Sequence, residues 1–264
     1  ELVIVKDGQE GMQADGSYFQ HSKLLCAAGS YGAELAKGMY TFMTQLEGTC
    51  FQLPMEKLNL FASHILDGHR YFHRGSGTAY FSIGRSAVYA SGAGNFMGVS
   101  RVLSQIEGVE RAEEMAQYRA SFDDFAKTID SHKFFPMSYV LVRTRPEYYM
   151  AVRGAHKSFI LTEVVNDQNM LGYNLSYGAN TCYMYYGDEY QAIGAVLDFA
   201  MFPGITAYHE DDVRLMKRYT EDYKKNWGPK TYTGSHCDGV VDQTTGLGAM
   251  YMELINDGLS GKLA

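Results

Sequence analysis

The change of character that decides the fold lies at residues 137–152, which read MSYVLVRTRPEYYMAV. Two short runs of β-branched and aromatic residues, 137–142 and 148–152, flank the pair Arg145-Pro146. Such runs, parted by a turn signal, are typical of neighbouring antiparallel strands. Further runs of this kind occur at 159–165, 181–186 and 249–254. We therefore predict antiparallel β-sheet for the second half of the chain.

The part of the chain before this point shows helical spacing instead. Apolar side chains recur every three to four residues, which is the period of an α-helix with one buried face. The ranges with this spacing are 33–43, 58–66 and 102–106. Helices followed by antiparallel strands indicate an α+β fold, and we place the predicted domains at residues 1–132 and 133–264.

Length and composition bound the class of protein. The chain has 264 residues, 46% of them hydrophobic and 20% charged, which is enough to bury a sizeable core. It has no run of eighteen apolar residues, and its first residues, ELVIVKDG, resemble neither a signal peptide nor a membrane span. We expect a soluble chain that does not act on membranes. Any export signal would then lie outside this sequence.

The charge balance argues against one class of partner. A net charge of -7 disfavours a nucleic-acid binder, which needs a broad basic face. An acidic polymer stays possible as a substrate, because a cleft is charged locally. Two stretches do concentrate basic groups, the first with His69, Arg70, His73, Arg74 and Arg85, the second with Arg143, Arg145, Arg153, His156 and Lys157. They fit either a cleft for a polyanion or scattered surface charges.

Two segments could carry chemistry. In the first, His21 follows a glycine-containing segment and Tyr31 lies ten residues later at the start of a predicted helix, so the two could converge on one substrate. The alternative is a packed Tyr and a surface His. In the second, Gly84 lets the backbone approach a partner closely while Arg85 points at an anion. The alternative there is an Arg that pairs with a local carboxylate.

A third segment is rich in amides. Residues 162–173 contain Glu163, Asn166 and Asn169, and they follow an apolar run. This composition suits hydrogen bonding to a ligand rich in hydroxyl groups. Ordinary capping of a loop by Asn and Asp explains it as well.

Motifs for cofactors and metals do not occur. The sequence has no phosphate-binding glycine loop, no Gly-x-Ser-x-Gly and no His-Glu-x-x-His. We predict no cofactor and no catalytic metal, and read the acidic run 209–212 as a solvated loop. A structural calcium ion is left open.

Taken in order, these segments resemble one family. The resemblance is to the polysaccharide lyases that include hyaluronate, chondroitin AC and xanthan lyases, most of all the chondroitin AC lyases. It extends from about Gly11 to Leu259. The segments that carry it are residues 15–21, 31–32, 84–86, 145–149, 163–172 and 202–206.

This resemblance implies a fold and an activity. The fold would be the C-terminal part of an incomplete α/α toroid followed by an antiparallel β-sandwich domain, in a fragment of a longer protein. The activity would be cleavage of a uronic-acid-containing polysaccharide, such as chondroitin or hyaluronan, by β-elimination. The partner would be an acidic polysaccharide, and the enzyme would be secreted or periplasmic.

The resemblance also implies roles for individual residues. His21 would neutralise the substrate carboxylate, Tyr31 would take the C5 proton, and Arg85 would stabilise the Tyr31 phenolate. Glu163 would complete the catalytic network. The residues expected to contact substrate are Gln20, Tyr89, Asn166 and Asn169.

Some positions depart from the family pattern. The spacing from His21 to Tyr31 is one residue longer than usual, Tyr89 stands where a second Arg is usual, and a Trp before Pro203 is absent. They motivate an alternative, a carbohydrate-binding relative that keeps the fold without catalysis. A purely structural protein is a third interpretation.

Overall fold

The computed structural model describes most of the chain. The residues outside the description are 1, 7–8, 22, 26–29, 89–93, 161, 167, 170–171, 173–174, 176–177, 191–195, 199–200, 206–235, 257–258 and 264, and only the backbone is described at 87–88, 254–256 and 259–263.

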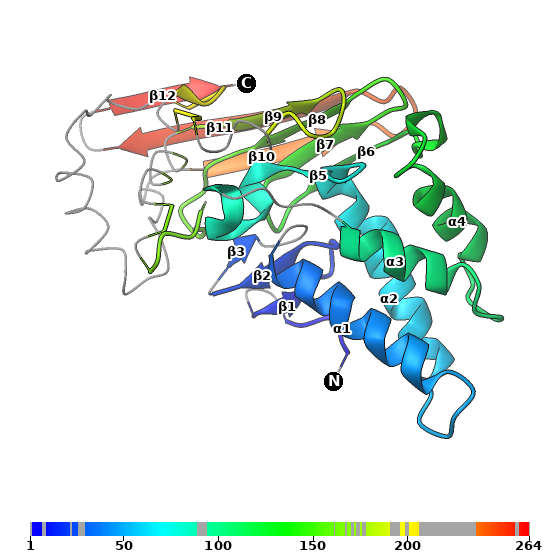
Figure 1. Ribbon diagram of the computed structural model, residues 1–264. Coiled ribbons are helices and arrows are strands. Elements are labelled where there is room, and N and C mark those ends of the chain that lie inside the picture. The colour runs from blue at the N-terminus through cyan, green and yellow to red at the C-terminus, as the bar shows by residue number, and fades with distance from the viewer. Residues whose placement is uncertain are drawn as a thin grey trace.

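A layer of helices forms the first half of the fold (Figure 1). Helix α1 (Tyr31–Leu46) lies against α3 (Gly94–Leu103), which also contacts α2 (Met55–Asp67) and α4 (Ala112–Ala120). Each of α1, α2 and α3 buries one apolar face, as the three- to four-residue spacing predicts.

Short elements surround the helices. A small antiparallel sheet precedes α1, and a hairpin with several 3₁₀ turns connects α2 to the rest of the fold. The strands of the small sheet are β1 (Gly11–Met12), β2 (Tyr18–Gln20) and β3 (Leu24–Leu25). The hairpin is β4 (His73–Arg74) with β5 (Gly77–Thr78), and the 3₁₀ turns are η1 (His69–Phe72), η2 (Tyr80–Ser82), η3 (Gly84–Val88) and η4 (Phe125–Lys127).

Two antiparallel sheets form the second half. In the first sheet the strands follow one another in order, β6 (Ser131–Phe135), β7 (Val140–Thr144), β8 (Tyr149–Arg153) and β9 (Asn180–Met184). Alternate residues of β7, β8 and β9 are buried, so one face of this sheet contributes to the same apolar core as the helices.

The second sheet covers part of the other face. It contains β10 (His236–Val241), β11 (Gly248–Asn256) and β12 (Leu259–Leu263) in that order. A Cβ on Gly239 would clash with the Phe134 ring at 2.7 Å, so glycine allows the two sheets to approach closely there.

Several predicted elements need correction. The expected strand at 159–165 is wrong in the described residues, because this segment makes only single bridges, from Ile160 to Leu24 and from Val165 to Gln168. The helix predicted at 102–106 ends at Leu103. The strand predicted from residue 137 starts only at Val140, since Tyr139 has a φ of 53° and belongs to a turn.

Some elements were not predicted at all. Among the strands they are β1 to β6, β10 and β12, most of which are short or mix polar and small residues. Strand β6 begins at Ser131, and the placement of the domain boundary at 132/133 stays a prediction.

Both interpretations of the basic stretches are wrong for four members. His69, His73, Arg74 and Arg153 are buried, so they lie neither on a scattered surface nor in an open cleft. Arg74 donates to the carbonyl oxygens of Tyr185 at 2.8 Å, of Arg145 at 2.8 Å and of Pro146 at 2.6 Å. It therefore fastens the hairpin β4–β5 to the loops of the sheet.

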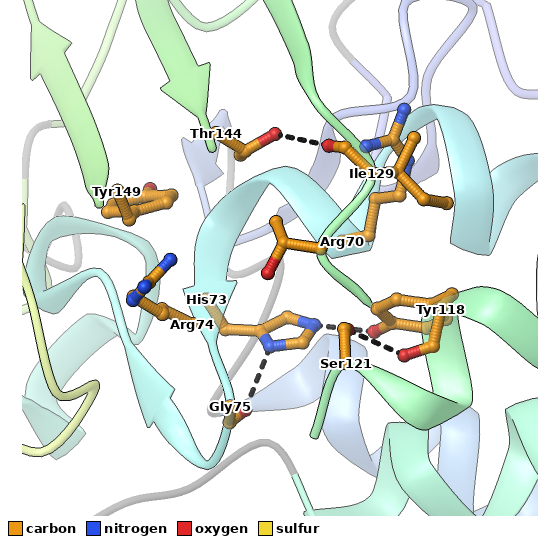
Figure 2. Close-up of a pocket in the computed structure, with 10 residues that line it drawn as sticks. Arg70, His73, Arg74, Gly75, Tyr118, Ser121, Ile129, Thr144 and Tyr149 are labelled. Atoms are coloured by element: carbon orange, nitrogen blue, oxygen red, sulfur yellow. Dashed lines mark hydrogen bonds between the residues drawn. The ribbon is translucent and has the colours of Figure 1, made fainter. Parts of the chain in front are cut away.

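Figure 2 shows the small cavity beside these groups, with His73 between Gly75 and Tyr118. The cavity has a volume of about 30 Å³, room for about one water molecule. The Nδ1 of His73 lies 3.0 Å from the Gly75 carbonyl, and its Nε2 contacts the Tyr118 hydroxyl. These contacts fit a neutral ring that donates from Nδ1 and accepts at Nε2.

Burial makes two core histidines sensitive to acid. Burial lowers the pKa of His64 to about 3, with a further contribution from Lys133 against an opposing one from Asp67. It lowers the pKa of His73 to about 4, where Arg70 adds to the effect and the Gly75 carbonyl opposes it. The usual pKa of about 6.5 applies in the unfolded chain. The unfolded chain thus binds more protons below pH 6.5, and stability is lost as the pH falls from there towards the folded pKa values.

We predict that His64→Leu removes part of this acid sensitivity. Between pH 7 and pH 5 the wild-type chain should lose about 2 kcal/mol of unfolding free energy through each of the two histidines, and the variant should lose about 2 kcal/mol less. Urea denaturation at the two pH values, followed by circular dichroism, measures this difference. Equal losses of unfolding free energy in the two proteins would contradict the conclusion that burial of His64 makes the fold sensitive to acid.

Candidate active site

Tyr31 is fixed at the first position of α1. Ser30 precedes the helix as its N-cap residue, so the Tyr31 side chain projects from the first turn of α1. Its ring packs against the buried side chains of Leu24 and Ile160. The ring of His21 meets it edge-on, with 4.9 Å between the centroids and 72° between the planes.

His21 lies in the turn between β2 and β3. Its φ of 50° is a left-handed conformation, and it directly follows Gln20, which pairs with Leu24. The Nδ1 of His21 lies 3.1 Å from the Oε1 of Glu163. This contact orients the imidazole from a segment far away in the sequence.

The Asp15-Gly16-Ser17 turn before it is a structural tether. Asp15 accepts hydrogen bonds from the backbone amides of Ser17 at 2.8 Å and Met137 at 2.9 Å. Gly16 has a φ of 92°, and a Cβ there would lie 2.6 Å from the carbonyl oxygen of Asp67. The turn thus holds the small sheet, with His21 at its end, against both α2 and the large sheet.

Arg85 and Glu163 form the centre of the site. Gly84, with a φ of 58°, turns the chain so that the backbone amide of Arg85 donates to Oε2 of Glu163 at 3.2 Å. The Nη1 of Arg85 makes a short contact with Oε1 of Glu163 and also donates to the Tyr31 hydroxyl at 3.2 Å. One guanidinium nitrogen therefore contacts both the carboxylate and the phenol.

Burial explains why these groups cluster. The side chain of Glu163 has 0% of its surface exposed, and a buried carboxylate needs charged or hydrogen-bonding partners. Desolvation favours the neutral form of Arg85, but the Tyr31 hydrogen bond and the charge of Glu163 outweigh it and raise the pKa of Arg85. The guanidinium therefore stays charged beside the Tyr31 hydroxyl.

The structure thus brings together the four predicted catalytic residues. His21, Tyr31, Arg85 and Glu163 come from the small sheet, from α1, from η3 and from the segment after β8. Sequence reasoning did not anticipate the apolar support under Tyr31, which Leu24 and Ile160 supply. No local pattern links these two residues, because they meet through a single long-range β-bridge.

The predicted substrate-binding residues lie in different environments. Gln20 donates to Glu10 at 2.8 Å at the edge of the small sheet. Asn166 is exposed, with a φ of 58°, three residues after Glu163. Tyr89 lies outside the described residues, as does the acidic run 209–212. Substrate contact by these residues stays a prediction.

Asn169 is buried behind the site. Its side-chain amide donates to Thr162 Oγ1 at 2.8 Å and to the carbonyl oxygen of Glu163 at 2.9 Å. The second bond holds the backbone of Glu163 directly, and the first holds the side chain of the preceding residue. Its contact with substrate stays a prediction, and the described bonds assign it a supporting role.

Neither a metal cluster nor a membrane-spanning helix occurs in the described part of the chain. Among those residues, no group of three or more His, Cys, Asp or Glu side chains is arranged to hold a metal ion. Within the same ranges, no helix has the length and apolar character needed to cross a membrane.

Comparison with known families decides the relationship. The model of the polysaccharide lyase family 8 N-terminal alpha-helical domain matches residues 2–125, and that of the family 8 super-sandwich domain matches residues 130–264. The chain belongs to polysaccharide lyase family 8. A curated relative, the Chondroitinase-AC of Pedobacter heparinus, is 30% identical over an alignment 263 positions long, which covers 97% of this chain and 36% of that protein. The chain thus spans about a third of the length of this relative.

Solved structures confirm the fold class of this family 8 chain. A chondroitinase AC lyase structure matches with a TM-score of 0.71 and 22% identity, over 97% of this chain and 39% of that one. A Paenibacillus xanthan lyase matches with a TM-score of 0.61 and 16% identity, over 97% and 28% of the two chains. The prediction of a partial helical toroid followed by antiparallel sheets is therefore correct.

We predict that substitutions of the two asparagines near Glu163 differ in their effect on stability. Asn169→Ala should lower the unfolding free energy by about 1–3 kcal/mol, because it leaves buried groups without their hydrogen bonds. Asn166→Gly should change it by less than about 0.5 kcal/mol, since glycine tolerates the left-handed backbone at this exposed position. Urea denaturation of the two variants measures both values. A similar loss in each would argue against the supporting role of Asn169.

Proposed function

We propose that this protein is a lyase that cleaves a uronic-acid-containing polysaccharide by β-elimination. The observation that carries the proposal is the position of the Arg85 guanidinium, which contacts both the buried Glu163 carboxylate and the Tyr31 hydroxyl. This arrangement suits a phenol that must lose and regain a proton during each turnover.

The proposed reaction starts with a proton transfer. The Tyr31 phenolate removes the proton from C5 of the uronic acid, next to the carboxylate, and His21 helps neutralise the charge that builds on that carboxylate. The electron pair of the C–H bond then forms a double bond between C4 and C5, and the bond from C4 to the glycosidic oxygen breaks. Tyr31 returns a proton to the leaving oxygen. The products are an unsaturated uronate end and a new hydroxyl end.

The electrostatics of the site support Tyr31 as the base. A free tyrosine has a pKa of about 10 and is a poor base at neutral pH. A cation 3.2 Å from the hydroxyl favours the phenolate over the phenol. Glu163 holds this cation in place from a fully buried position. General-base catalysis of this kind contributes typically about 10²- to 10⁴-fold in rate.

The relatives support an acidic polysaccharide as the substrate. Their names specify chondroitin for two of the relatives described above and xanthan for the third, and a further solved structure is a chondroitin AC lyase in complex with chondroitin sulphate. We propose chondroitin as the first substrate to test, with hyaluronan as a close second. Because such polymers are too large to enter a cell intact, we propose that the enzyme acts after secretion or in the periplasm.

We predict that Tyr31→Phe abolishes turnover. The wild-type full-length protein should raise the near-ultraviolet absorbance of chondroitin or hyaluronan, because the product contains a conjugated unsaturated uronate. The variant should lose at least about 10²-fold in kcat while it still binds the polymer, since only the proton-transferring oxygen is removed.

Tyr186→Phe is the matched control for this test. Tyr186 is 72% exposed and does not belong to the proposed site, so the activity of this variant should equal that of the wild type. A wild-type protein that binds the polymer without any rise in absorbance would favour the non-catalytic relative. Turnover in Tyr31→Phe at the wild-type rate would exclude Tyr31 as the base.

A further inference from the structure

Arg153 is a buried cation directly behind the site. It is the last residue of β8, and it has 0% of its surface exposed. Its Nη1 donates to the carbonyl oxygen of Phe81 at 3.0 Å, and its Nη2 donates to the carbonyl oxygen of Ile160 at 3.2 Å. One guanidinium thus joins two segments that are distant in the sequence.

The first of these segments carries Arg85. Phe81 lies in η2, four residues before Arg85 and separated from it by the glycine turn at Gly84. Short hydrogen-bonded turns fill the interval, with Ser82 Oγ bonded to the Ala79 carbonyl at 2.7 Å and the Ser86 amide to that of Ile83 at 3.2 Å. Because these turns are hydrogen-bonded, a displacement of the Phe81 carbonyl group should also displace Arg85.

The second segment carries Glu163 and supports Tyr31. Ile160 lies three residues before Glu163 and forms a β-bridge with Leu24. Its side chain and that of Leu24 make the apolar patch on which the Tyr31 ring packs. The position of the Ile160 backbone therefore affects both the position of the Tyr31 ring and the path of the segment that leads to Glu163.

We propose that Arg153 is a positioning residue that holds Arg85, Glu163 and Tyr31 in register, an inference that rests on the proposed lyase function. Burying a guanidinium is costly, and its rigid planar fork carries N–H donors on separate nitrogens, so that one side chain fixes two carbonyl groups in a set relative geometry. The cation does not touch the reacting groups. It acts by fixing the two backbone segments that carry them.

Arg74 provides a matched control within the same chain. It is also a buried arginine that donates to backbone carbonyl oxygens, those of Tyr185, Arg145 and Pro146. None of these carbonyl groups belongs to a segment that carries a site residue. Arg153→Met and Arg74→Met therefore remove the same kind of interaction, one behind the site and one away from it.

Hydrogen exchange tests the proposal without any need for catalysis. The backbone amide of Arg85 donates to Glu163, so its exchange rate reports whether the two segments keep their register. In the full-length protein we expect this amide to exchange at least about 10-fold faster in Arg153→Met than in the wild type, and at the wild-type rate in Arg74→Met. Unchanged exchange in Arg153→Met would overturn the proposal.

Kinetics supply the second readout. Arg153→Met should lower kcat by about 10- to 100-fold and leave KM within about 3-fold, because a displacement of catalytic groups by about 1 Å has effects of this size. Arg74→Met should keep kcat within about 3-fold at a temperature well below the melting points of both variants. In a Glu163→Gln background, Arg153→Met should lower kcat by less than about 3-fold further, since both changes disturb the same arrangement of Arg85, Glu163 and Tyr31. Losses of kcat that merely follow the melting temperature in both variants would overturn the proposal.

Failure of the variant to fold and failure of the proposed function can be told apart. If Arg153→Met does not fold, Arg153→Lys replaces it, because lysine keeps the charge but carries its donors on a single nitrogen in place of the rigid planar fork. The same exchange and kcat criteria then apply. If the wild-type protein shows no lyase activity, the proposed function fails, while the exchange rate of the Arg85 amide still decides whether Arg153 sets the register.

Discussion

The site depends on one constraint, which is the need to neutralise the Glu163 carboxylate in the interior. Its side chain has no exposure to water, so its charge must be balanced by groups that other segments deliver. Arg85, 78 residues away in the sequence, supplies the cation, and His21, 142 residues away, supplies a ring nitrogen at hydrogen-bond distance. Tyr31 then receives the remaining contact of the guanidinium. A carboxylate that does not itself touch the proposed reacting atoms thus determines where the base and its cation lie.

Buried basic side chains also satisfy polar groups where the helices meet the first sheet. Helix ends and irregular loops bring backbone carbonyl groups into this interface, and buried carbonyl groups need donors. Long basic side chains supply them. Lys133 of β6 donates to the carbonyl oxygen of Asp15 at 2.6 Å and also contacts that of Asp67, while Arg74 and Arg153 serve the loops on either side. Arg74 and Arg153 therefore belong to the interior, although they lie in the basic stretches of the sequence.

Sequence periodicity predicted the parts of the fold where one face of an element is buried. Helices α1 and α2 follow from apolar residues that recur at the helical period, whereas strands β8 and β11 follow from short runs of aromatic and other apolar residues. The segment 159–165 has the composition of a strand and was predicted wrongly. Its apolar residues are buried for another reason, since Ile160 supports Tyr31 and the following residues carry the buried Glu163. The apolar composition of this segment indicates that it is buried, but it does not indicate whether a neighbouring strand is available for pairing.

The site itself could be predicted only as an ordered set of segments. Taken alone, the interval from His21 to Tyr31 is weak evidence, and it is one residue longer than the family pattern. The structure shows that the longer interval does not separate the pair, because the two rings are in edge contact at 4.9 Å. What aligns them lies elsewhere, in the Glu163 contact that orients His21 and in the Leu24 and Ile160 patch that supports Tyr31. Long-range contacts of this kind have no signature in local spacing, so a small change in spacing between two site residues is a poor guide to whether their geometry survives.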